Sequence, residues 1–183
     1  MAAVTNGGAL SGARPLRDSL YGDLIWSRPG IFRRELRLEA GSELLADLRW
    51  EKLFSFEAVA ESADGRWIIG RHRRGSLRGG IIMREAGTGI EVAAFRHGWR
   101  RAGALRFAAG AEFTWEREGF WRPTYFWRSA EHPRFIAFRS VFGLTRRFEM
   151  DVEPAARLVA ELPALVLLGA YLMAMMVAQS HAH

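Results

Sequence analysis

The feature that most constrains the fold is an uncharged apolar segment near the C-terminus, residues 162–178, with the sequence LPALVLLGAYLMAMMVA. Pro163 lacks a backbone donor, so we expect a helix to start or bend there and to continue to about Gln179. That helix has no polar side to expose to water. It must therefore be surrounded by apolar atoms, either those of lipid or those of its own protein.

Before this segment, residues 20–150 form short apolar runs separated by turn signals. Between Asp64-Gly65 and Gly87 the turns recur about every 10–12 residues, which is typical of an antiparallel β domain. The runs alternate with period two, as where Phe113 and Trp115 are separated by Thr114, and this pattern indicates strands with one buried face. About ten to twelve strands fit the sequence.

Together the two patterns predict a mainly β (α+β) fold, a roughly twelve-stranded antiparallel barrel that encloses the hydrophobic C-terminal helix. A barrel of about twelve strands is too wide for its own side chains to fill, and an apolar helix would occupy the space. We expect a flexible tail over residues 1–18 and a single barrel domain over residues 19–183. Within that domain, we expect a short helix at residues 154–161 and the central helix at residues 163–179.

Other placements of the helix stay open at this point. As a membrane anchor, its apolar residues would span only about 26 Å of a hydrocarbon layer about 30 Å thick. The flanking Arg157, His181 and His183 are weak anchors. Alternatively, the helix could pack against an edge of the sheet, or the strands could form a sandwich, which needs no helix.

Charge and cysteine content limit the function. The 183 residues include 26 basic and 20 acidic side chains, a formal net charge of +6, and Lys52 is the only lysine. Codon usage alone could favour arginine, whereas the functional interpretation is anion binding, because guanidinium pairs well with phosphate and carboxylate. The chain has no cysteine, which excludes disulfides, thiolate zinc sites, iron–sulfur clusters and a cysteine nucleophile.

No catalytic signature is present. His72, His97 and His132 are isolated in the sequence, and the chain has no Gly-x-Ser-x-Gly motif for a nucleophile. Gly87-Thr88-Gly89 lies in an expected hairpin turn rather than before a helix, so we do not interpret it as a phosphate loop. We therefore expect no enzyme activity, no catalytic residue, no metal and no cofactor.

Clusters of arginine are the candidate binding residues. They can equally be the solvated rim of a barrel, and arginine at strand edges opposes edge-to-edge pairing. We expect Trp121, Phe126 and Trp127 to lie in the core or the barrel wall. The candidate anion- or lipid-binding residues are Arg71, Arg73, Arg74, Arg78, Arg100, Arg101, Arg146 and Arg147.

A resemblance to a known family rests on residues 94–99, 105–107, 113–115, 119–122, 125–127 and 161–169. These segments, in a β-rich body that ends in an apolar helix, resemble small uncharacterised bacterial members of the tubby C-terminal-like superfamily. That superfamily includes tubby proteins, LURP-one-related proteins and phospholipid scramblases. The resemblance covers about residues 20–178 and implies a twelve-stranded barrel around a central helix.

For function the resemblance implies little. Tubby proteins bind phosphoinositides and scramblases are linked to lipid movement, so lipid is the partner it implies, but it assigns no functional residue. The chain departs from both groups. Tubby lipid contacts use lysine and arginine, and here Lys52 is the only lysine. Scramblases have a cysteine-rich lipidation segment, which this chain lacks.

We therefore expect a non-enzymatic barrel that binds an anionic partner, phospholipid at the cytoplasmic face of a membrane being the first candidate. The alternative is an accessory or structural subunit of a larger assembly, with the C-terminal helix as its membrane anchor. We expect a cytoplasmic protein, peripheral to or anchored in the membrane. An anionic lipid or a protein is the expected partner, and nucleic acid is not. The sequence does not indicate an oligomeric state.

Overall fold

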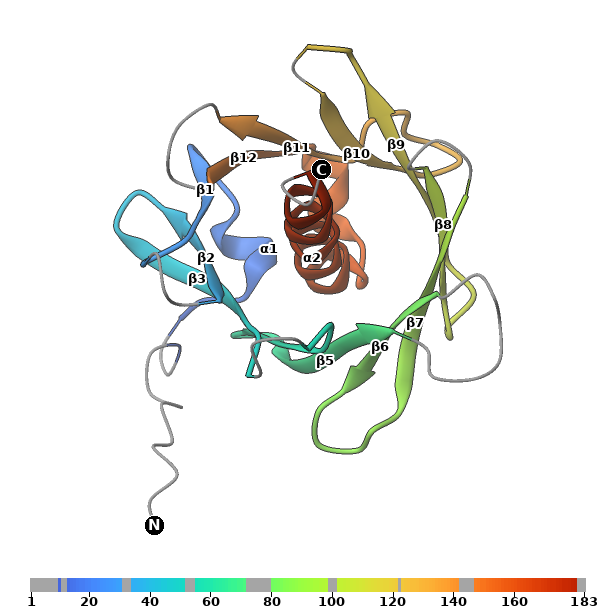
Figure 1. Ribbon diagram of the computed structural model, residues 1–183, viewed down its shortest axis with the longest axis horizontal. Helices are drawn as coiled ribbons and strands as arrows, with labels where there is room; N and C mark the ends of the chain where they lie inside the picture. Colours follow the sequence, from blue (N-terminus) through green and yellow to red (C-terminus); the bar gives the residue numbers. More distant parts are fainter. Residues whose placement is uncertain are drawn as a thin grey trace.

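The computed structural model describes residues 10, 13–30, 34–51, 55–71, 80–98, 102–121, 123–141 and 147–180, with side chains up to residue 176. Twelve antiparallel strands form a closed barrel around a helix (Figure 1). The strands are β1 (Leu24–Ser27), β2 (Glu35–Ala40), β3 (Glu43–Arg49), β4 (Ala58–Ser62), β5 (Gly65–Arg71), β6 (Ile81–Glu85), β7 (Glu91–His97), β8 (Gly103–Phe107), β9 (Glu112–Glu118), β10 (Thr124–Arg128), β11 (Ile136–Val141) and β12 (Arg147–Val152).

Pairing of the first strand with the last closes the barrel. Each strand is hydrogen-bonded to its neighbours in sequence, and β1 pairs with both β2 and β12, so that Leu24 lies opposite Ala40 on one side and Met150 on the other. Closure leaves no strand edge unpaired. The predicted twelve-stranded antiparallel barrel is confirmed, and the sandwich is not the fold.

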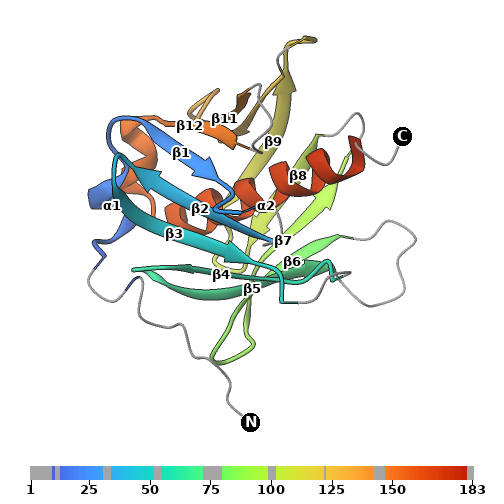
Figure 2. The ribbon, with the colours of Figure 1, turned by 60° about the vertical axis from the view of Figure 1, so that its left-hand side comes forward.

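The apolar C-terminal segment forms α2 (Leu162–Ser180), which runs through the barrel (Figure 2). Its described side chains from Leu162 to Met173 are buried, on all sides of the helix. A buried hydrogen bond fixes its position: Trp127 Nε1 on β10 donates to the carbonyl oxygen of Leu165 at 2.8 Å. The prediction of an enclosed helix is therefore confirmed, and the edge-packed and membrane-anchor placements are wrong, because the barrel itself provides the apolar surroundings.

No helix in the described part of the chain has the length and apolar character needed to cross a membrane. Helix α2 begins at Leu162, one residue before the predicted start. The short helix expected at residues 154–161 is a 3-10 helix, η2 (Pro154–Leu158), with Pro154 in its first turn.

One end of the barrel is closed by segments that flank the strands. Helix α1 (Leu16–Ser19) packs there against α2 and η2, and Leu16 and Leu20 are fully buried. Arg157 Nη2 donates a hydrogen bond to the Leu20 carbonyl oxygen at 2.7 Å. The predicted tail, residues 1–18, is thus too long, because Leu16 belongs to the core and the Leu16 backbone N–H donates to Asp64 Oδ2.

Close contact between α2 and the barrel wall depends on Gly169. A Cβ atom built at this position would lie 2.3 Å from Cζ of Phe138 on β11. The Phe138 ring is fully buried and packs against Trp115 and Phe148. It therefore has no free space to move into, and only glycine allows the helix and the wall to approach this closely.

We expect Gly169→Ala to destabilise the protein by about 1–3 kcal/mol, because overpacking outweighs the gain of about 1 kcal/mol in helix propensity. Urea unfolding measures this difference. Gly87→Ala is the control, since a Cβ at Gly87 meets nothing within 4 Å, and its free energy of unfolding should change by less than about 0.5 kcal/mol. A Gly169→Ala variant as stable as the wild type would contradict the packing described here.

Candidate functional site

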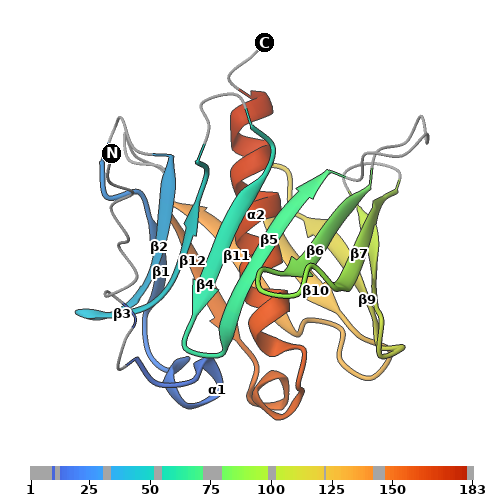
Figure 3. The ribbon, with the colours of Figure 1, turned by 90° about the horizontal axis from the view of Figure 1, so that it is seen from below.

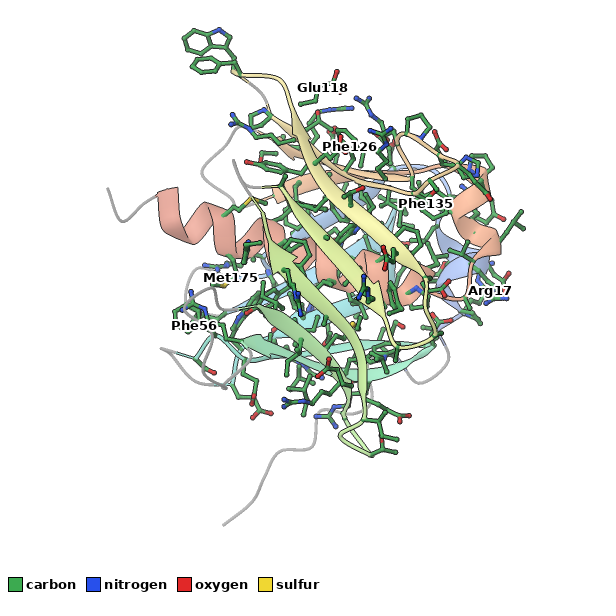
Figure 4. The ribbon with its side chains drawn as sticks, turned by 90° about the vertical axis from the view of Figure 1, so that its right-hand side faces the viewer. Arg17, Phe56, Glu118, Phe126, Phe135 and Met175 are labelled. Atoms are coloured by element: carbon green, nitrogen blue, oxygen red, sulfur yellow. The ribbon has the colours of Figure 1, made fainter. Side chains whose placement is uncertain are left out.

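Strand direction places alternate connections at opposite ends of the barrel. Because successive strands are antiparallel, the connections β1–β2, β3–β4, β5–β6, β7–β8, β9–β10 and β11–β12 all lie at one end. Helix α2 ends there as well (Figure 3). We call this end, with its strand termini and six connections, the C-terminal rim. Phe56 and Met175 mark it in Figure 4, and Arg17 marks the opposite rim.

The two rims differ in charge. The six segments that join strands at the C-terminal rim have only two acidic residues, Glu51 and Glu57. Their basic residues are Arg28, Arg33, Arg34, Lys52, Arg73, Arg74, Arg78, Arg100, Arg101, Arg122 and Arg146. The described segments of the opposite rim include the acidic residues Asp18, Asp23, Asp64, Glu131, Glu153 and Glu161. In the sequence, the segments that join strands at the C-terminal rim are therefore richer in basic residues than the described segments of the opposite rim, which also contain Arg14, Arg17, Arg134 and Arg157.

The predicted binding residues belong to the C-terminal rim where the structure describes them. Arg71 ends β5 and Arg147 begins β12; both are exposed, and no ion pair of the described residues includes either one. The other candidates lie outside the described residues: Arg73, Arg74, Arg78, Arg100, Arg101 and Arg146. In the sequence, each lies between two strands whose facing ends belong to the C-terminal rim.

Aromatic contacts hold two rim arginines next to α2. The Tyr171 hydroxyl on α2 donates to the Phe56 carbonyl oxygen at 2.5 Å, and its ring stacks on Trp50 with centroids 6.0 Å apart. Arg71 Cζ lies 3.7 Å from the centre of the Phe56 ring, and Arg34 Cζ lies 5.7 Å from that of Trp50. Burial raises the pKa of Tyr171 to about 12, although Arg71 and Arg34 act to lower it. Tyr171 therefore stays a neutral hydrogen-bond donor at physiological pH.

A small cavity of about 80 Å³ opens at this rim between α2 and the wall. His97 stands at its edge with its ring perpendicular to Phe95, 5.0 Å between centroids. Partial burial of the ring, and then the nearby charge of Arg71, lower the pKa of His97. The cavity is far smaller than a pocket for a metabolite-sized ligand. Its lining residues are Arg71, Ile81, Phe95, His97, Trp115, Tyr171, Leu172, Met175 and Met176.

The exposed aromatic pair at the C-terminal rim was not predicted. Trp127 is fully buried and Phe126 is buried, as expected, but Trp121 is 85% exposed and its neighbour Phe120 is 80% exposed. The expectation for Trp121 is wrong because it lies in the β9–β10 connection rather than on a strand. A usable signal was present in the sequence: Gly119 and Pro123 enclose the aromatic pair, and both residue types favour turns.

The opposite rim has a larger hollow, with a volume of about 490 Å³. Apolar side chains from β5, β7, β8 and α2 form part of its wall, among them Trp67, Val92, Phe107 and Pro163. Acidic residues Asp64, Glu91 and Glu161 and the basic Arg17 also line it. This hollow has neither the surplus of arginine nor the exposed tryptophan of the C-terminal rim.

Asp47 on the outside of β3 has the largest pKa shift of a described acidic side chain. Its Oδ1 lies 3.1 Å from Arg49 Nε, and Arg49 Nη2 lies 2.7 Å from Glu61 Oε2. Burial raises the pKa of Asp47 to about 6; Arg49 opposes this shift, and Glu61 and Glu35 reinforce it. Perturbed acids often mark active sites, but this one is explained by burial within an ion-pair network of the wall.

The described side chains at the C-terminal rim suit the binding of an anion rather than of a metal ion. Among the described residues, no three or more His, Asp or Glu side chains come together as a set that would hold a metal ion. Guanidinium groups at the C-terminal rim are donors that suit phosphate and carboxylate oxygens. No family model, curated protein or solved structure matches the chain. The arrangement of the rim is therefore the main evidence for function.

We expect Asp47→Asn to stabilise the protein by about 1–3 kcal/mol at pH 8 and to have little effect near pH 4. The folded-state pKa of about 6 exceeds the usual 3.8, so ionised Asp47 destabilises the fold above pH 6, and that penalty is relieved as the pH falls. Arg49 keeps Glu61 as a partner in the variant. Urea unfolding at both pH values measures the effect, with the exposed Asp23→Asn as control; a loss of stability at pH 8 would refute this account.

Proposed function

We propose that the protein is a non-enzymatic binding protein whose C-terminal rim recognises the anionic headgroups of a phospholipid surface. The observation that supports this most directly is the exposure of Arg71 and Arg147 at one rim, without a carboxylate partner among the described residues. Exposed guanidinium groups at one end of a barrel give that end a positive potential, which attracts a negatively charged surface.

A membrane fits this rim better than a small soluble anion does. The cavity at the rim is small, about 80 Å³, whereas the described candidates Arg71 and Arg147 lie on strands β5 and β12, which are not neighbours in the barrel. Each basic side chain close to an anionic membrane contributes about 1 kcal/mol. An extended surface of headgroups can contact several of them at once, which a single small ligand cannot.

The resemblance to the tubby C-terminal-like superfamily agrees with this proposal but supplies none of its residues. In this proposal the protein is peripheral to the cytoplasmic face of a membrane, and the rim is its contact surface. Helix α2 is not a membrane anchor, because its side chains from Leu162 to Met173 fill the barrel. No catalytic activity is part of the proposal.

A second candidate function is that of an accessory subunit in a larger assembly. It is favoured by the hollow of about 490 Å³ at the opposite rim and by exposed Leu158 and Ile90 at that end. Apolar side chains around a hollow are typical of a protein contact. Size-exclusion chromatography of a native extract tests it: elution at the mass of the single chain removes this candidate.

We expect the protein to float with vesicles that contain phosphatidylserine and not with vesicles of phosphatidylcholine alone. Arg71→Gln combined with Arg147→Gln should weaken binding to the anionic vesicles roughly tenfold to thirtyfold, because two charges near the membrane are lost. Raising the salt concentration should weaken binding of the wild type as well.

The matched control is Arg17→Gln combined with Arg66→Gln. These residues are exposed at the opposite rim, and the variant loses the same charge. It should bind the anionic vesicles as the wild type does. Equal flotation with both vesicle types, or an equal loss in the two double variants, would contradict recognition through the C-terminal rim.

A further inference from the structure

The tip of the β9–β10 hairpin exposes two adjacent aromatic side chains. Phe120 is 80% exposed and Trp121 is 85% exposed. The other described tryptophans are buried or half-buried, with Trp26, Trp115 and Trp127 at 1% exposure or less. Full burial of a large apolar side chain is worth about 1.5–3 kcal/mol. The fold itself does not bury Phe120 and Trp121, so a binding partner that covered them would gain this free energy.

The hairpin holds the pair beyond the paired strands. The last strand pair is Glu118 with Thr124, and Gly119 follows with φ +83°, a left-handed conformation that favours glycine. Phe120 and Trp121 then pack edge to face, with ring centroids 5.4 Å apart. The two rings form one apolar unit at the end of the hairpin.

Arg134, from the β10–β11 connection, packs against the end of β9 and against β10 below this tip. Arg134 forms an ion pair with Glu118 and lies over the Phe126 ring, with Cζ 5.2 Å from its centre. Glu118 and Phe126 are labelled in Figure 4 at this hairpin. The ion pair offsets the negative charge of Glu118, the acid closest in sequence to the tip. The hairpin thus has exposed aromatic rings at its tip, and below the tip the paired Glu118 does not repel an anionic surface.

Resting on the proposed function, we propose that Phe120 and Trp121 insert into the interfacial layer of an anionic bilayer. Phe and Trp side chains are favoured at the boundary between headgroups and acyl chains. Arg71 and Arg147 belong to the same rim as the hairpin tip, so the rings can enter the membrane while the guanidinium groups contact phosphates. The barrel then docks end-on, with the C-terminal end of α2 toward the membrane and the opposite rim away from it.

The absence of cysteine makes this orientation directly measurable. Trp121→Cys and Ile90→Cys each provide a single labelling site for a polarity-sensitive fluorophore. Ile90 is the matched control, because it is 63% exposed in the β6–β7 turn of the opposite rim. With vesicles of phosphatidylcholine and phosphatidylserine, the label at position 121 should shift to the blue and be quenched by brominated lipid. The label at position 90 should do neither.

Unlabelled variants give an independent readout. Phe120→Ala combined with Trp121→Ala should reduce vesicle binding about tenfold to a hundredfold, because the apolar contribution is lost. Ile90→Ala should have no effect. Both positions are exposed, so the variants should keep the wild-type thermal unfolding midpoint, which separates a loss of binding from a loss of folding.

The outcomes separate this inference from the proposed function. If the wild type floats with anionic vesicles while the label at position 121 stays in water, insertion is refuted and headgroup recognition stands. A blue shift at position 90 instead of 121 refutes the end-on orientation. If the wild type does not float with anionic vesicles, the proposed function itself fails.

Discussion

The structure depends on the packing of one apolar helix inside one wide barrel. The helix needs apolar surroundings, and the barrel needs side chains to fill its interior. Twelve strands leave a space that their own inward side chains do not fill. Helix α2 occupies it with side chains buried on every side. Neither element is stable in water alone, since the helix would expose its whole surface and the barrel would enclose a void. Gly169 and the hydrogen bond from Trp127 to Leu165 show how closely the two are fitted.

Antiparallel closure also determines which residues share a rim. Consecutive connections alternate between the two ends, so residues far apart in sequence, such as Arg71 and Arg147, come to the same rim. The described interior is packed with apolar side chains, and the cavity of about 80 Å³ opens at the C-terminal rim. A binding function therefore has to use the ends or the outer wall. In the proposed function, the exposed side chains of Arg71, Arg147 and Trp121 at the C-terminal rim suit contact with a surface rather than with a small molecule.

The sequence predicted the global features well because they depend on patterns of many residues. The apolar run at residues 162–178 requires enclosure wherever it lies, and the period-two runs require strands, so the barrel and its central helix could both be inferred. Single positions were harder. Trp121 is as hydrophobic as Trp127, and only the position of the turn decides that one is exposed and the other buried. The raised pKa of Asp47 depends in part on strand register, which places Glu61 beside it. The burial of Leu16 depends on packing against α2, which no local sequence pattern shows.

The pairing of β1 with β12 has a consequence for how the chain reaches its native state. Pairing residues as distant as Leu24 and Met150 costs loop-closure entropy, and folds with many such contacts form slowly. Until β1 pairs with β12, the sheet has two free edges that can pair with other chains. The apolar inner face of the sheet stays exposed to water until α2 packs against it. The kinetic hazard for this protein is therefore aggregation of an open sheet, which ends when α2 is enclosed and β1 pairs with β12.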